Sequence, residues 1–370
     1  MAGIYYHIPF CKRICGYCDF YRTALMCDLP QVVETMTKEI GRRSDYLGGE
    51  KITTRYFGGG TPSLCSPDQI ATLLTATSEV MDCSEVVETT LEANPDDLPA
   101  DYLNGVRRAG IDRLSIGIQS FDDECLRLMN RRHTAQEAID AVRRAQAVGF
   151  ENITIDLIFG VPGFGGDSLH RSIDQALALG VQHISAYLLS FEPNTRFGKM
   201  AERGELIPID DDEAQAAYLL MHNRLTEAGF DHYEISNYAL AGFEARHNSS
   251  YWSGVKYLGI GPAAHSYDGH SRQWNVSSVA RYLAGEAPER EQLGEEEHLE
   301  EWLMTRLRTR RGVNLEKFEQ RFGKSLTKRL LNAARPLLEN GSLTVSEGHI
   351  AIPVVHLMTS DYIIGSLFGL

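Results

Sequence analysis

The chain has 370 residues and a mass of 41.3 kDa, which is enough for one barrel-sized domain of roughly 200–250 residues and a smaller module. Hydrophobic residues at 43% and charged residues at 23% are ordinary globular values, so they exclude a fully disordered or fibrous chain. The formal net charge of −14 argues against nucleic acid as the main partner, because phosphate contacts need clustered Lys and Arg.

The N-terminal segment and the cysteine content indicate the cellular compartment. The first residues, MAGIYYHIPF, contain no basic region followed by an apolar run, so they do not predict a secretion signal. No stretch approaches the apolar length of a membrane span. Seven cysteines, an odd number in a long chain, fit a reducing compartment better than a disulfide framework. We therefore expect a soluble cytoplasmic protein.

Strand-like and helix-like segments alternate along residues 1–240. The strand-like runs cover residues 4–8, 53–57, 86–92, 113–118, 152–159 and 183–190. The helix-like runs cover residues 29–43, 67–81, 135–148, 169–179 and 211–228. Such alternation is typical of βα units around a parallel sheet. The sequence predicts an α/β fold, a partial (β/α)6 TIM-like barrel, whose site residues lie at the C-terminal ends of the strands.

The remaining residues divide into two further segments. A short strand is expected at 232–235, and residues 238–275 are expected to be an irregular stretch rich in Gly and aromatic residues. We assign residues 241–285 to a region that carries the segment HNSSYW and to a linker. Residues 286–370 contain charged, helix-like segments, and two short apolar runs at their end predict a small hairpin. They predict a small, mostly helical, winged-helix-like module.

Three cysteines form the pattern C-x3-C-x2-C directly after the first predicted strand. Cys11, Cys15 and Cys18 lie close enough in sequence to bind one soft metal centre, either zinc or three irons of a 4Fe–4S cluster. A structural zinc normally needs a fourth protein ligand. The local candidates, His7 and Asp19, give no familiar zinc spacing. The pattern therefore favours the cluster, and a zinc-stabilised binding module stays an alternative.

Polar residues and glycines follow the predicted strands. The segment GGGTPS (58–63) allows close backbone approach to a ligand. A carboxylate at the mouth of a barrel strand, such as Glu92, is suited to bind hydroxyl or ammonium groups. Asp156 lies in an apolar run, where a lone carboxylate is costly unless it faces a partner or ligand. Gln119 ends another strand, and Arg131 follows in the segment LMNRRHT.

Together these motifs resemble the radical S-adenosylmethionine (SAM) superfamily. In that superfamily the open iron of the cluster chelates SAM, which an electron from the cluster then cleaves. The sequence spacing from Glu92 to Gln119, Arg131 and Asp156 agrees with the spacing in the coproporphyrinogen III oxidase-like branch of the superfamily. By that resemblance the residues that would bind SAM are Tyr5, Phe20, Gly59, Gly60, Thr61, Glu92, Gln119, Arg131 and Asp156.

Two families of this branch compete. The oxygen-independent coproporphyrinogen III oxidase, an enzyme of porphyrin biosynthesis, decarboxylates coproporphyrinogen III to protoporphyrinogen IX. It carries a fourth cysteine where this chain has Phe20, and a longer segment before the first cysteine. Both differences favour a resemblance to the HemW family of haem chaperones, with the oxidase as the alternative.

The segment HNSSYW (247–252) matches the HNxxYW motif that the HemW family associates with haem. Imidazole is a common axial iron ligand, and Tyr and Trp offer flat apolar surfaces to a macrocycle. The resemblance thus assigns haem binding to His247, Tyr251 and Trp252, with His265 as a second candidate near the site. It also implies a haemoprotein acceptor and an electron donor such as flavodoxin or ferredoxin. Peripheral membrane contact would need a local basic segment such as residues 306–311.

Overall fold

The computed structural model describes residues 1–369. It contains a large sheet in which the first six strands of the chain lie side by side, parallel and in the order of the sequence. These strands are β1 (Ala2–Ile8), β2 (Ile52–Gly59), β3 (Glu88–Ala93), β4 (Arg113–Gln119), β5 (Asn152–Phe159) and β6 (His183–Leu188). Each overlaps a predicted strand. In β5, Ile153, Ile155 and Leu157 are buried, as expected for a parallel strand covered by helices. The predicted partial barrel is therefore confirmed.

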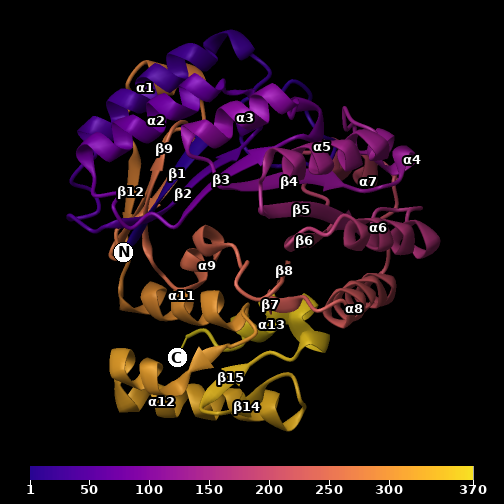
Figure 1. The fold of residues 1–370 in the computed structure, drawn as a ribbon. Helices are drawn as coiled ribbons and strands as arrows, with labels where there is room; N and C mark the ends of the chain where they lie inside the picture. Colours follow the sequence, from indigo (N-terminus) through magenta and orange to yellow (C-terminus); the bar gives the residue numbers. More distant parts are fainter. Residues whose placement is uncertain (370) are drawn as a thin grey trace.

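Helices cover the outside of this sheet (Figure 1). They are α1 (Leu29–Arg42), α2 (Pro67–Val80), α3 (Ala100–Ala109), α4 (Asp123–Leu128), α5 (Ala135–Val148), α6 (Gly166–Ala178), α7 (Arg196–Glu202) and α8 (Asp211–Glu227). Capping boxes fix where two of them begin. The side chains of Ser66 and Thr134 accept the backbone N–H of Gln69 and Glu137, whose side chains bond back. Helices α3, α4 and α7 lie outside the predicted ranges.

Both edges of the sheet extend beyond the six barrel strands. Strand β9 (Lys256–Ile260) pairs parallel to β1, and β10 (His265–Tyr267), β11 (Ser271–Trp274) and β12 (Glu289–Gln292) follow antiparallel. At the other edge lie β8 (Asn237–Ala239) and β7 (Asp231–Glu234).

The prediction that residues 238–275 are irregular is therefore wrong. They contain the short helix α9 (Arg246–Trp252) as well as strands β9 to β11. These strands are only three to five residues long, too short for a clear local pattern. They form because an existing sheet edge supplies their hydrogen-bond partners.

The C-terminal part combines helices with a second, three-stranded sheet. Its elements are α11 (Glu295–Leu307), β13 (Val313–Asn314), α12 (Leu315–Glu339), β14 (Thr344–Ser346), β15 (His349–Ala351) and α13 (Ser360–Gly365), and α10 (Val279–Leu283) precedes them. Strands β14 and β15 pair antiparallel as the predicted hairpin. Figure 1 shows α11 between α9 and α12, so this part packs beside the barrel's late elements. Since β12 belongs to the large sheet, the division at residues 240 and 285 stays a prediction.

Across residues 1–369, no helix combines the length and apolar composition that a membrane span requires.

Candidate functional site

The three cysteines of the first loop line one cavity of about 570 Å³. Cys11 is buried, whereas Cys15 and Cys18 are half-buried. The backbone N–H of Cys11 donates to the carbonyl of Thr23 over 2.9 Å, so the loop folds back on itself. Burial raises the pKa of the Cys11 and Cys18 thiols, and metal binding would have to displace their protons.

The placement of these thiols bears on the kind of metal centre that fits. No group of three His, Cys, Asp or Glu side chains within residues 1–369 converges closely enough to hold a single metal ion. A tetrahedral Zn²⁺ needs four ligands about 2.0–2.3 Å from the ion, whereas three thiols line this cavity. A cluster of several irons accepts thiolates at separate metal atoms. Three thiols that line one cavity offer the ligand set that such a cluster takes.

The glycine segment after β2 packs against the cysteine loop. Gly59 has a φ of +110°, a conformation that residues with a side chain rarely adopt. A Cβ on Gly60 would lie 2.8 Å from the carbonyl oxygen of Phe10, the residue before Cys11. Next to them, the Thr61 hydroxyl donates to Cys11 Sγ over 3.4 Å. The glycines thus permit the close contact that holds the loop, and their backbone lines the cavity.

Two carboxylates face the cavity from β3 and β5. Glu92 accepts the Tyr56 hydroxyl over 2.7 Å and the Gly59 N–H over 3.2 Å. Burial, with repulsion from Asp156, raises the pKa of Glu92 to about 7. Burial also raises the pKa of Asp156 to about 6, although the Ser115 hydroxyl donates to it. Such a perturbed pair in a cavity is suited to accept hydrogen bonds from hydroxyl or ammonium groups of a ligand.

Gln119 and Arg131 complete the polar wall. Gln119 has a φ of +73° at an irregularity in the β4–β5 pairing, and such strain is commonly kept at functional sites. Arg131 donates from Nη1 to Cys15 Sγ over 3.2 Å, and from Nη2 to Asn94 Oδ1 over 2.7 Å. Its Nη2 also donates to the carbonyl of Gly117. Arg131 therefore joins the cysteine loop to the strand ends.

The structure brings most of the predicted cluster and SAM residues together. The predicted residues that line this cavity are Cys11, Cys15, Cys18, Phe20, Gly59, Gly60, Thr61, Glu92, Gln119, Arg131 and Asp156. Tyr5 instead lies deeper in the barrel, where its ring stacks near Tyr56 and His247 at centroid distances of 6.0 and 6.4 Å. Its hydroxyl bonds to His7 Nδ1 over 3.2 Å.

Sequence reasoning missed several residues of this site. Tyr56 bonds to Glu92, and Asn94 bonds to Arg131. Asn94 carries a usable signal, because it directly follows the strand end that supplies Glu92. Tyr56 carries no such signal, because aromatic residues are common within strands. Arg132, next to Arg131, instead makes ion pairs of 2.7 and 2.9 Å with the consecutive carboxylates 96 and 97.

The predicted haem residues divide between the barrel interior and a second cavity. His247 is fully buried, and its Nδ1 and Nε2 bond to the hydroxyls of Thr54 and Tyr251 over 2.9 and 2.8 Å. Burial lowers the pKa of His247 to about 3, so its ring is neutral. Its backbone N–H donates to the Glu88 carboxylate over 2.8 Å, which anchors α9 to the barrel. Only Tyr251 and Trp252 of the motif line the second cavity.

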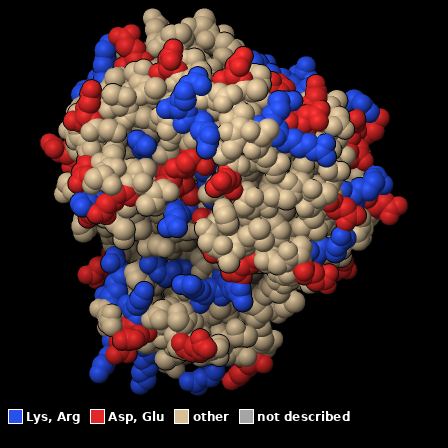
Figure 2. All heavy atoms as spheres, viewed as in Figure 1, with Lys and Arg blue, Asp and Glu red and all other residues tan. Residues whose placement is uncertain are grey.

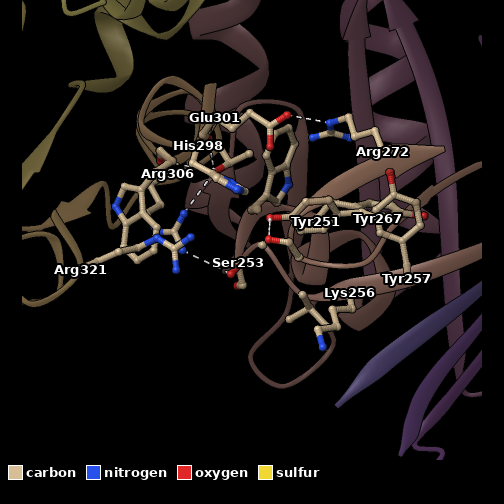
Figure 3. A pocket seen from close by; sticks show the side chains of 16 residues that line it. Tyr251, Ser253, Lys256, Tyr257, Tyr267, Arg272, His298, Glu301, Arg306 and Arg321 are labelled. Atoms are coloured by element: carbon tan, nitrogen blue, oxygen red, sulfur yellow. Dashed lines mark hydrogen bonds and ion pairs between the residues drawn. The ribbon is translucent and has the colours of Figure 1, made fainter. Parts of the chain in front are cut away.

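This second cavity, of about 420 Å³, lies between α9 and the C-terminal helices. Figure 3 shows Arg306 and Arg321 on one side of it and Tyr251, Tyr257 and Tyr267 on the other. His265, the second candidate for haem, is instead exposed on β10, with its ring 5.9 Å from that of Trp274. These two cavities therefore differ in chemistry.

Comparison with known proteins defines the class. The family model for the radical SAM superfamily matches residues 5–176, and the model for the HemN C-terminal domain matches residues 293–353. The solved structure of coproporphyrinogen III oxidase (HemN) from Escherichia coli shares the fold, with a TM-score of 0.85 at 21% identity. The match covers 100% of this chain and 90% of that chain. The fold is thus that of a radical SAM protein.

Sequence relatives narrow the class to one family. The chain is 34% identical to "Heme chaperone HemW" of Bacillus subtilis over 100% of both chains. It is 35% identical to the protein of that name from Mycobacterium tuberculosis H37Rv, over 99% of this chain and 95% of the relative. The Escherichia coli protein of that name is 38% identical over 71% and 69%. The chain belongs to the HemW family.

Proposed function

We propose that this protein is a cytoplasmic haem chaperone that holds a 4Fe–4S cluster and SAM, binds haem and delivers it to acceptor haemoproteins. The observation that carries the proposal is the end-to-end similarity to proteins named as haem chaperones. Phe20, in place of the fourth cysteine of the oxidase pattern, supports it further. Likeness to the oxidase structure at 21% identity concerns the fold alone.

The first cavity would hold the cluster and SAM. Cys11, Cys15 and Cys18 are the ligands that the chain offers to the cluster, which when bound supplies an open iron position and a single electron. The residues around the cluster would orient SAM, the second ligand of this cavity. Glu92 and Asp156 accept hydrogen bonds from SAM hydroxyl or ammonium groups, because both carboxylates face the cavity.

Arg131 contributes the cationic part of that pocket. Its guanidinium lines the cavity while it bonds to Cys15 and Asn94. A carboxylate of SAM would complete its coordination by charge-assisted hydrogen bonds. The backbone of Gly59 and Gly60 allows the ligand to approach closely, since no side chain intervenes.

Haem would bind beside α9. Tyr251 and Trp252 already face the second cavity. For His247 to coordinate iron, as the family motif predicts, its Nε2 must exchange the Tyr251 hydroxyl for the metal. In the conformation described here His247 positions the Tyr251 ring at the cavity wall.

Delivery of haem needs an acceptor, and SAM cleavage would need an electron donor of the flavodoxin or ferredoxin kind. The predicted basic segment 306–311 gives little support for membrane contact. Arg308 pairs with Asp361, Arg310 pairs with Asp231, and Arg306 faces the second cavity. We propose a haemoprotein as the acceptor.

An anaerobic haem titration tests the proposal. The full chain, reconstituted with iron and sulfide, is titrated with haem and followed by absorbance, with bovine serum albumin as a control for nonspecific uptake. We expect saturation near one haem per chain and transfer of the bound haem to an added apo-haemoprotein. Haem uptake that does not saturate, or that equals the albumin control, would contradict it.

A further inference from the structure

The second cavity joins the family's haem motif to the C-terminal helices. Tyr251 and Trp252 come from α9, whereas Trp302 and Arg306 come from α11 and Arg321 from α12. Its volume of about 420 Å³ falls in the range of small-molecule sites. In Figure 2, Lys and Arg side chains gather over the position that α11 occupies in Figure 1, beside a hollow in the surface.

Two arginines in this cavity share one aromatic ring and lack carboxylate partners. The Arg306 guanidinium lies 3.2 Å from the Trp302 ring centroid, and that of Arg321 lies 5.4 Å from it. Among residues 1–369 neither arginine makes an ion pair, whereas Arg272 across the cavity pairs with Glu301 over 2.6 Å. Burial, together with repulsion from Arg321, lowers the pKa of Arg306 to about 10. An anionic ligand would relieve this unbalanced positive charge.

The walls of the cavity suit a flat ring. Tyr251 and Tyr257 meet edge to face at a centroid distance of 4.7 Å, and Tyr267 continues the aromatic wall. Trp302 also lines the cavity, and its buried Nε1 has no hydrogen-bond partner within residues 1–369.

One histidine reaches this cavity, and it differs from His247. His298 lies one helical turn before Trp302 on α11 and lines the cavity. Its ring has no hydrogen-bond partner among residues 1–369. Both ring nitrogens of His247 are occupied by hydroxyl groups, and His247 is fully enclosed. A ligand in this cavity therefore meets a free imidazole at His298 and none at His247.

We infer that this cavity is the haem-binding site, in which Arg306 and Arg321 pair with the haem carboxylates and His298 coordinates the iron. The inference rests on the proposed function, since it places the cargo that a haem chaperone carries. The aromatic residues of α9, β9 and β10 then contact the macrocycle, and the HNSSYW segment shapes the site through Tyr251 and Trp252.

Titrations of the full chain with haem and with haem dimethyl ester, which lacks free carboxylates, test the arginines. Arg306→Gln/Arg321→Gln should weaken haem binding by at least about tenfold, because a charged hydrogen bond is lost at each position. The double variant should weaken binding of the dimethyl ester much less, since esterification already removes the carboxylates with which the arginines would pair. Arg329→Gln on the same helix, an exposed site outside the cavity, should bind haem as wild type. Circular dichroism checks that each variant folds.

A spectroscopic comparison tests the iron ligand. His298→Gly should change the absorption spectrum of bound haem, and added imidazole should restore it, whereas His170→Gly, at an exposed position outside the cavity, should leave the spectrum as in wild type. A changed spectrum in His247→Gln with an unchanged one in His298→Gly would overturn the ligand assignment. Wild-type haem affinity in the double arginine variant would overturn the site while leaving the proposed function intact. Absence of specific haem binding by wild type would refute the proposed function itself.

Discussion

Glu92 lines the first cavity, and its replacement by Gln should change stability and cofactor binding in opposite directions. The folded-state pKa of Glu92 is raised from 4.5 to about 7, mainly by burial. A carboxyl group with a raised folded pKa contributes its full stability below its unfolded value, and that contribution is lost as pH rises from about 4.5 through about 7. The shift corresponds to about 2–3 kcal/mol in the free energy of unfolding, allowing for water in the cavity.

Gln resembles the protonated carboxyl group but cannot ionise. In the cluster-free protein, Glu92→Gln should therefore match wild type near pH 4 and exceed its free energy of unfolding at pH 8 by about 2 kcal/mol. Urea unfolding at both pH values, followed by circular dichroism, measures this difference. In the cluster-loaded protein the same variant should bind SAM about tenfold more weakly in calorimetry, because a charged acceptor is lost. Equal stability differences at the two pH values, or unchanged SAM affinity, would refute the reasoning.

Three further predictions concern the cysteine loop and α9. Replacing any one cysteine of the C-x3-C-x2-C triplet by Ala should abolish cluster assembly, measured as bound iron and sulfide, whereas the buried Cys65→Ala should retain it. Gly60→Ala should destabilise the chain by about 1–3 kcal/mol, because its Cβ would meet loop backbone at 2.8 Å. The control Gly41→Ala, with open space around it on α1, should be neutral or slightly stabilising in the same urea titration. Tyr251→Phe should cost about 1–3 kcal/mol, since it leaves His247 Nε2 without its hydroxyl partner; unchanged unfolding would contradict that bond.

The barrel was predictable because its signals are local. The apolar run at residues 152–159 predicts a strand, and the capping residues Ser66 and Thr134 predict where two helices begin, each within one short window of sequence. Strands β9 to β12 carry no such signal, because they are only three to five residues long and β9 joins the sheet by pairing with the distant strand β1. The first cavity was predictable for a related reason. The cysteines and glycines form linear motifs, and parallel strand ends must meet at one edge of the barrel.

The second cavity was not predictable to the same degree. The HNSSYW segment indicates aromatic and imidazole groups, but it does not reveal that His247 points into the barrel. The spacing of Trp302 and Arg306 places both on one face of a helix, yet the sequence does not bring Arg321 from α12 to that face. These contacts depend on how α9, α11 and α12 pack, which no local pattern encodes.

The central claim is that this chain carries haem and does not make porphyrin. The most direct measurement supplies one cluster-loaded, anaerobic preparation with either haem or coproporphyrinogen III, in the presence of SAM and a chemical reductant, and analyses the products by chromatography. We expect stoichiometric haem binding with transfer to an apo-haemoprotein, and coproporphyrinogen III that stays intact. Conversion of coproporphyrinogen III to protoporphyrinogen IX, without specific haem binding, would contradict it.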